Sequence, residues 1–508
     1  MQDTPGTIGA LRAVVGTLVA ITLVAGSAVI AAAQIPTSAT SSDNAALAAL
    51  MDAVKTGRTA EVARMLAAGQ PPSAAEPDGT TALHWAVHRD DIETTRALLK
   101  AGADVSATNR YGVAPMMVAA TNGHDAILAL LMESGADPNA ATPEGETVLM
   151  TATRTGSVDA VERLLAAGAD PNHAEKWHQQ TALMWAAAQN QAAAAAALVR
   201  AGTHLDVRSQ GGFTPLLFAT REGHIEALQV LLDAGANPDD TLPNGMSALV
   251  LATYNAHYDL AVTLLEAGAK PDAAEQGWAA LHQVVWTRRP NLGRNPPFPV
   301  PVGDRNGLDM ARALLAHGAN PNTRQTQEPR DGNRNLLKRL GATPFLLAAK
   351  AADAEMMQLL ADHGADPGLT TDLGTTALMA AAGVGIWKIG ENPGTNEEAL
   401  EAATLAWALG NDINAADING DTALHGAIHR GADGIVRFLA DNGADLDATN
   451  GIGWTALSIA EGVFYPNTFN RHPDIVGLLE ELGANPMVGR RRPEDLAPWE
   501  RAAAVEPR

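Results

Sequence analysis

The chain of 508 residues is predicted to be all-α, an α-solenoid of about twelve two-helix units. The first observation is a hexapeptide, Thr-Ala-Leu-His-Trp-Ala at Thr81, that recurs in register along the chain. Steps between neighbouring copies are 32 to 34 residues, except for two of 64 and 46. Such a period marks an array of identical supersecondary units rather than one globular core. The copies begin at Thr81, Ala114, Thr147, Thr181, Thr214, Ser247, Ala279, Thr343, Thr376, Thr422 and Thr455.

Composition and charge exclude several classes of function and indicate how the core is built. Hydrophobic residues make up 46% of the chain but aromatic residues only 4%, so Ala and Leu are expected to fill a thin core between stacked helices. The formal net charge of −22 repels phosphate backbones, which argues against nucleic acid as a partner. The chain has no cysteine, which excludes disulfides, thiolate nucleophiles and cysteine–zinc sites.

The N-terminal segment 1–33 reads as a secretory signal peptide. Arg12 precedes an uncharged run that ends in Ala31-Ala32-Ala33, a small-residue cleavage signal. The alternative is an uncleaved N-terminal anchor, because the run is long enough to span a bilayer. Either reading places the body in the periplasm or outside the cell, inner-membrane anchored in the second case. Residues 34–44 are polar and are predicted to be a flexible linker.

The unit that begins at Thr214 illustrates the local structure that is expected of every unit. Thr214 is a good N-cap and Pro215 suits the first helical position, where its missing N–H is harmless. Gly223-His224 ends this short helix, and apolar residues at helical spacing over 225–232 predict a second one. Gly235 should end that helix because it tolerates positive φ. A hairpin-like loop then leads to the next unit.

These motifs resemble the ankyrin repeat. The resemblance rests on Thr80–Ala86, on Gly223-His224 and on Leu-Leu-Ala-Ala-Gly-Ala-Asp-Pro-Asn over 164–172, and it covers residues 45–488. Together with the N-terminal signal segment it implies an exported, bacterial-type ankyrin-repeat protein, and the resemblance implies a concave face made by loop tips and first helices. It also implies a protein partner. The His residues of the hexapeptide are then expected to hydrogen-bond between loops: His84, His282 and His425.

Four inserts interrupt the pattern, all in the C-terminal half of the chain. They are rich in proline, basic and aromatic residues, which favours ordered, function-bearing loops over disordered ones. The inserts lie near 286–305, 324–340, 383–396 and 461–472. The tail, 489–508, is predicted to be disordered.

A basic and aromatic stripe at the ends of the first helices is the main candidate binding surface. In an acidic protein it suggests a protein partner that is itself acidic. The alternative is local, because Arg and Lys are favoured at helix C-termini by the helix dipole. The candidate residues of the stripe are Arg89, Arg154, Arg221, Tyr254, Trp286, Lys350 and Arg430. Loop tips and the third insert add Arg110, Tyr111, Trp177, Trp278 and Trp387.

No motif for catalysis is found, and neither a metal nor another cofactor is predicted. The loop with His173 and His178 is a weak metal candidate without an evident third ligand. The chain is therefore predicted to be a non-catalytic, monomeric scaffold that binds a protein through its concave face and C-terminal inserts. The alternatives are an accessory subunit of a secreted enzyme system, or a small-molecule or glycan site near Trp286, Trp387 and Phe464.

Overall fold

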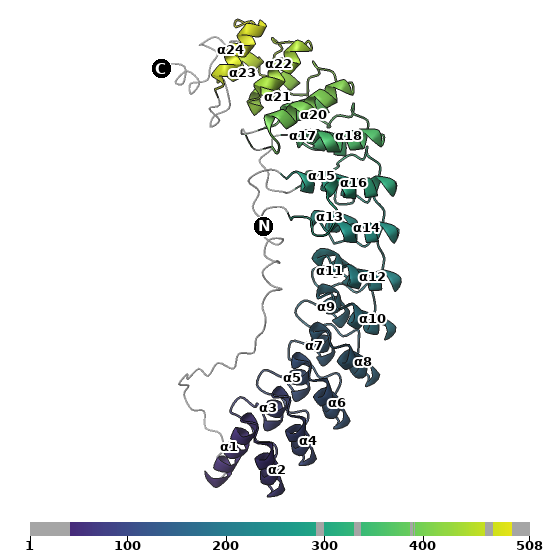
Figure 1. Ribbon diagram of the computed structural model, residues 1–508, viewed down its shortest axis with the longest axis vertical. Coiled ribbons are helices and arrows are strands. Elements are labelled where there is room, and N and C mark those ends of the chain that lie inside the picture. The colour runs from purple at the N-terminus through teal and green to yellow at the C-terminus, as the bar shows by residue number, and fades with distance from the viewer. Residues whose placement is uncertain are drawn as a thin grey trace, which may run out of the picture.

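The computed structural model describes residues 41–290, 299–329, 337–386, 390, 392–462 and 471–489. Within these ranges the chain forms twenty-four helices and no strand, only isolated β-bridges. Figure 1 shows the helices stacked in pairs along an arc, with the first helix of each pair on the inner side and the second on the outer side. The prediction of an all-α solenoid with twelve two-helix units is confirmed.

The inner helices are the first of each unit. They are α1 (Ser41–Lys55), α3 (Ala82–His88), α5 (Pro115–Asn122), α7 (Val148–Thr155), α9 (Ala182–Ala188), α11 (Pro215–Glu222), α13 (Ala248–Tyr254), α15 (Ala280–Arg288), α17 (Pro344–Lys350), α19 (Ala377–Ala382), α21 (Ala423–Arg430) and α23 (Ala456–Ala460). The outer helices are α2 (Thr59–Ala67), α4 (Ile92–Lys100), α6 (Asp125–Glu133), α8 (Val158–Ala166), α10 (Ala192–Arg200), α12 (Ile225–Asp233), α14 (Tyr258–Glu266), α16 (Gly307–Ala316), α18 (Ala354–Asp362), α20 (Asn396–Ala408), α22 (Asp433–Asp441) and α24 (Pro473–Leu482).

The unit from Thr214 forms as its residues predict. The Thr214 hydroxyl accepts a hydrogen bond from the Leu217 N–H at 3.3 Å, and Pro215 opens α11. After α12, Gly235 adopts a φ of 92°. Its N–H and that of Ala236 donate to carbonyls of the last turn of the helix, each at 2.9 Å. This left-handed ending satisfies carbonyls that the helix itself leaves without partners.

Backbone hydrogen bonds link the tips of neighbouring hairpin loops along the arc. Seven such bonds occur in the described residues, for example from the Lys176 N–H to the Glu144 carbonyl at 2.8 Å. From Gly277 onward they connect every successive pair of tips. Pro143 and Pro243 occupy the donor position at two earlier junctions, where they have no N–H to donate.

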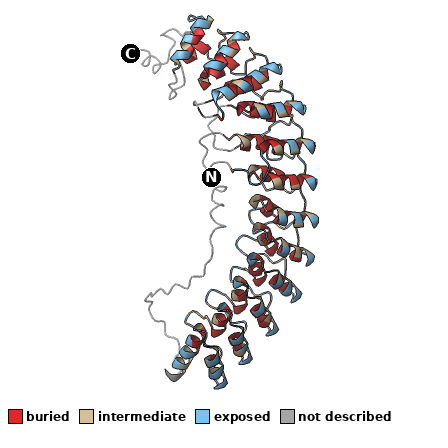
Figure 2. Ribbon diagram, in the orientation of Figure 1, coloured by how far each residue is buried: buried red, intermediate tan, exposed pale blue. Residues whose placement is uncertain are grey.

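The apolar seam between units forms one continuous core from Leu50 to Ala484. Buried residues lie where helices face each other, and exposed residues gather on the outer helices (Figure 2). One boundary differs from the sequence prediction. Helix α1 begins at Ser41, inside the segment 34–44 predicted as a linker, because Ser, Asp and Asn at 41–44 also suit the start of a helix. None of the helices in the described ranges has the length and apolarity that a membrane crossing requires.

Candidate binding surface

The inner face is open in the N-terminal half of the arc. There the stripe residues Arg89 and Arg154 are exposed, and Arg221 and Tyr254 are half-buried. Each of these four residues stands at or just after the end of an inner helix, as the repeat register predicts. The first helices α3, α7, α11 and α13 thus present this part of the stripe to solvent.

Two cations of this open surface, Arg154 and Arg221, are already paired with carboxylates. An Arg154 Nη lies 3.5 Å from a carboxylate oxygen of Glu146, and the guanidinium lies over the Trp185 ring at 5.7 Å. The Nε of Arg221 lies 2.7 Å from a carboxylate oxygen of Glu222. The Arg221 guanidinium also lies 5.0 Å from the ring centroids of both Phe213 and Phe218. At Arg154 and Arg221 the stripe therefore consists of cation–aromatic–carboxylate clusters, whereas Arg89 donates to the Lys55 carbonyl at 2.9 Å.

A third cluster of this type was missed by the sequence reasoning. Lys55, at the end of α1, forms an ion pair with Glu76 and lies 4.7 Å from the Trp85 ring centroid. The indole N–H of Trp85 donates to the same carboxylate at 2.9 Å. The first unit lacks the hexapeptide, so its Lys55 could not be aligned with the stripe. Trp85 packs against the core while remaining half-buried.

Two loop tips carry exposed aromatic side chains. Tyr111 is 58% exposed and Trp177 is 72% exposed. The Arg110 guanidinium lies over the Tyr111 ring at 4.8 Å, and the Trp177 ring stacks on His178 at a centroid distance of 4.9 Å. Both tips project from the side of the inner helices and extend the open surface.

The tip residue Trp278 takes a different place. Its ring packs against Trp286 at 5.6 Å, and its indole N–H donates to the Gln283 side chain at 3.2 Å. The Arg339 guanidinium covers Trp286 at 5.3 Å. Both tryptophans are half-buried, so they join α15 to the second insert more than they project from the surface.

The stripe does not continue to the surface at its C-terminal end. Lys350 is 7% exposed and Arg430 is 5% exposed. The Lys350 ammonium donates to the Asn392 side chain at 3.4 Å, and an Arg430 Nη donates to the carbonyls of Gly394 and Thr395 at 3.1 and 3.2 Å. The third insert therefore covers the inner face here. The prediction of these two residues as partner contacts is wrong, because the repeat register cannot reveal what an insert covers.

Ion pairs and close backbone packing anchor the inserts to neighbouring units. The Asp353 carboxylate, which is fully buried, lies 2.7 Å from the Nε of Arg288 and 3.7 Å from the Nε of Arg289. Gly385 lies so close to Leu337 that a Cβ on the glycine would come within 2.5 Å of the Leu337 nitrogen. The second and third inserts thus pack against each other. Trp387 and Phe464 lie outside the described residues.

The three histidines of the hexapeptide form hydrogen bonds between successive loops, which is the role that the resemblance to the ankyrin repeat implied. The His84 Nδ1 accepts from the Thr81 N–H at 3.1 Å, so its Nε2 carries the proton and donates to the Val113 carbonyl at 2.9 Å. His282 and His425 make the equivalent bonds, at 3.2 and 3.0 Å, to the carbonyls that precede the next units. Burial lowers the pKa of His84 and His425, and it lowers the pKa of His282 to about 4.

The described residues show no metal site. They contain no group of three His, Asp or Glu side chains placed to hold a metal ion, and His173 and His178 are not brought together with a third ligand. His84, His282 and His425, whose pKa values are lowered by burial, make contacts between loops. The arrangement offers surfaces for contact.

Comparison with known families agrees with this geometry. Models described as ankyrin repeats match residues 50–292 in overlapping segments, 340–372 and 408–460, which together make up more than half of the chain. The chain belongs to the ankyrin-repeat family.

Similar curated proteins share the repeats but little else of their length. Mouse ankyrin repeat and SOCS box protein 16 is 33% identical over 147 residues, which is 28% of this chain and 31% of that protein. Mouse protein phosphatase 1 regulatory subunit 12A is 37% identical over 82 residues, 16% of this chain and 7% of that protein. A Caenorhabditis elegans homolog of transient receptor potential cation channel subfamily A member 1 is 33% identical over 126 residues, 25% of this chain and 9% of that protein. The chain spans about a third or less of these relatives. What they share with it is a protein-interaction module.

Proposed function

We propose that this chain is an exported, non-catalytic scaffold that binds a partner protein on the open inner face between α3 and α13. The observation that carries the proposal is the set of half-buried aromatic rings there, each held by a neighbouring cation: Trp85 by Lys55, Trp185 by Arg154 and Phe213 by Arg221. Rings that are already ordered lose little side-chain entropy on binding, which is the property of interface hot spots.

The compensated charges change the expected chemistry of the partner. Each cation of the three clusters lies beside a carboxylate: Lys55 beside Glu76, Arg154 beside Glu146 and Arg221 beside Glu222. A net attraction for an acidic partner is therefore weak here, and recognition through aromatic contact is favoured over recognition through charge. The inserts then act mainly to close and stiffen the C-terminal half, instead of forming the contact surface themselves.

Replacing Trp85 and Trp185 together with Ala tests this surface. The partner is first captured from the native envelope by wild-type protein and identified by mass spectrometry, and its affinity for each variant is then measured. We expect the double variant to bind at least about 30-fold more weakly, as loss of one hot spot of about 2 kcal/mol predicts. Trp407→Ala is the matched control, because Trp407 is a partly exposed tryptophan on the outer helix α20. Equal loss in the control, or full affinity in the double variant, would contradict the proposal.

Export is tested by the N-terminus of the protein in its native cells. Cleavage after Ala33 predicts a soluble mature chain that starts at Gln34 and is recovered from the periplasm or the medium. Peptide sequencing of the purified protein measures this directly. A chain that retains residues 1–33 and sediments with membranes would instead establish the anchored alternative.

A further inference from the structure

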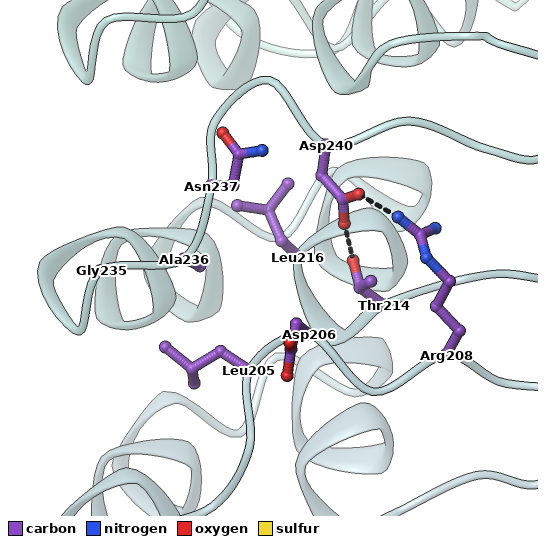
Figure 3. A pocket seen from close by; sticks show the side chains of 9 residues that line it. All are labelled: Leu205, Asp206, Arg208, Thr214, Leu216, Gly235, Ala236, Asn237 and Asp240. Atoms are coloured by element: carbon purple, nitrogen blue, oxygen red, sulfur yellow. Dashed lines mark hydrogen bonds and ion pairs between the residues drawn. The ribbon is translucent and has the colours of Figure 1, made fainter.

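A cavity of about 400 Å³ lies between the loop that follows α10 and the loop that follows α12. Figure 3 shows Leu205 and Asp206 on the first loop, Asn237 and Asp240 on the second, and Leu216 of α11 between them. The cavity therefore combines an apolar floor with carboxylates at its sides. It is separate from the aromatic clusters of the inner face.

The cavity lies at a junction that lacks a hydrogen bond found between neighbouring loops elsewhere in the array. At seven junctions a loop Asn or Asp side chain accepts a hydrogen bond from a backbone N–H of the next loop, at 2.7 to 3.0 Å. These pairs are Asn139–Asp170, Asn172–His204, Asp239–Lys270, Asp272–Asn320, Asn322–Asp366, Asn414–Asp445 and Asp447–Asn485.

Asp206 and Asn237 occupy the same two positions but do not pair in the described structure. The residue type is not the reason, because Asp makes this bond at three other junctions. The loop tips are also unlinked at this junction, since Pro243 has no N–H. Asp206 therefore keeps a carboxylate without a hydrogen-bond partner among the described residues.

The other carboxylate of the cavity is already occupied. The Asp240 carboxylate forms an ion pair with Arg208 and accepts a hydrogen bond from the Thr214 hydroxyl (Figure 3). Arg208 in turn donates to the carbonyls of Gly212 and Thr241, each at 2.8 Å. Among the described residues Arg208 forms its ion pair with Asp240 and none with Asp206. One uncompensated negative charge therefore stands beside the apolar floor of Leu205 and Leu216.

We propose that this cavity binds a lysine or arginine side chain of a partner protein. The aliphatic stem would lie on Leu205 and Leu216 while the charged end pairs with Asp206, as long basic side chains do at the edge of apolar surfaces. The net charge of −22 adds a long-range attraction for a basic partner segment. This inference rests on the proposed function and adds a second contact, with its own specificity, on the loop side of the array.

The test uses the mature full-length chain and blocked pentapeptides with one central residue between alanines. The central residue is lysine, or norleucine, which has a comparable aliphatic chain and no charge. Binding is measured from the methyl NMR signals of Leu205 and Leu216. We expect the lysine peptide to shift these signals and the norleucine peptide to bind at least tenfold more weakly.

Variants separate the charge effect from the cavity itself. Asp206→Asn should weaken the lysine peptide at least tenfold and leave the norleucine peptide unchanged. Because Asp206 is exposed and its side chain makes no hydrogen bond or ion pair among the described residues, the circular dichroism of the variant should match that of wild type. Asp233→Asn removes the same charge from the exposed end of α12 and should leave both peptides unchanged.

Three results would overturn the inference: no shift at either leucine, equal binding of the two peptides, or undiminished lysine binding by Asp206→Asn. Capture of the partner through Trp85 and Trp185 does not involve this cavity. If capture persists while the peptides fail to bind, only the inference fails. If the peptides bind while the tryptophan variant captures normally, the proposed inner-face function fails and the cavity site stands.

Discussion

Asp353→Ala is expected to lower the free energy of unfolding by about 3–5 kcal/mol, the usual cost of removing one partner from a buried ion pair. The carboxylate is fully buried and shared by Arg288 and Arg289, whose side chains are themselves only 18% and 26% exposed. Without it, Arg288 and Arg289 would keep only the more exposed carboxylates of Glu355 and Glu398 as partners. The same carboxylate also caps α18 by accepting from the Met356 N–H at 3.2 Å.

Urea unfolding followed by circular dichroism measures this loss, with Asp91→Ala as the matched control. Asp91 caps α4 at the equivalent position by accepting from the Thr94 N–H at 2.9 Å. Its loss should cost about 1 kcal/mol, as for an ordinary cap. A cost for Asp353→Ala no larger than that of the control would mean that the ion pairs add nothing beyond the cap. The first insert would then be a passive loop.

Mild acid is expected to destabilise the array through its buried histidines. His282 has a pKa of about 4 in the folded chain and about 6.5 when unfolded, so the unfolded state binds the extra proton more tightly. The contribution of neutral His282 to the free energy of unfolding is therefore fully present above about pH 6.5 and is lost as the pH decreases towards 4. The full difference of about 2.5 pKa units corresponds to about 3 kcal/mol from His282 alone. His84 and His425 contribute in the same direction.

The measurement is the unfolding midpoint in urea between pH 6.5 and 5, a range in which most carboxylates stay ionised. His282→Gln should be less stable than wild type at pH 7 but should lose less stability on acidification. His317→Gln serves as the control, because His317 is exposed just after the end of α16 and makes none of the histidine contacts between loops. An unchanged slope in His282→Gln would show that another group causes the acid sensitivity.

The fold could be predicted from the sequence because everything that defines it is local. Caps such as Thr214, the first-turn Pro215 and the helix-ending Gly235 each act within a few residues and recur at a fixed period. The anchoring of the inserts could not be predicted. Arg288 and Asp353 are 65 residues apart in the sequence, and nothing near either residue specifies the other.

The binding surface was predictable only where the repeats stay regular. Arg154 and Arg221 lie on the open inner face as the register requires, but their neighbours Glu146 and Glu222 neutralise them. Lys350 and Arg430 follow the same register and yet are buried, because exposure depends on how an insert folds back. Nothing in the sequence indicated that Asp206 could bind a ligand, because its sequence context matches loops in which the equivalent side chain is paired.

The bonds between loop tips run along the length of the arc, which gives the molecule a mechanical polarity. Under tension between its ends, the C-terminal half would resist through unbroken tip-to-tip bonds and the ion pairs at Asp353. The N-terminal half would yield first at the junctions where Pro143 and Pro243 interrupt the row. The chain would then behave as a spring with a stiff end and a compliant end, and its aromatic contact surface would lie on the compliant one.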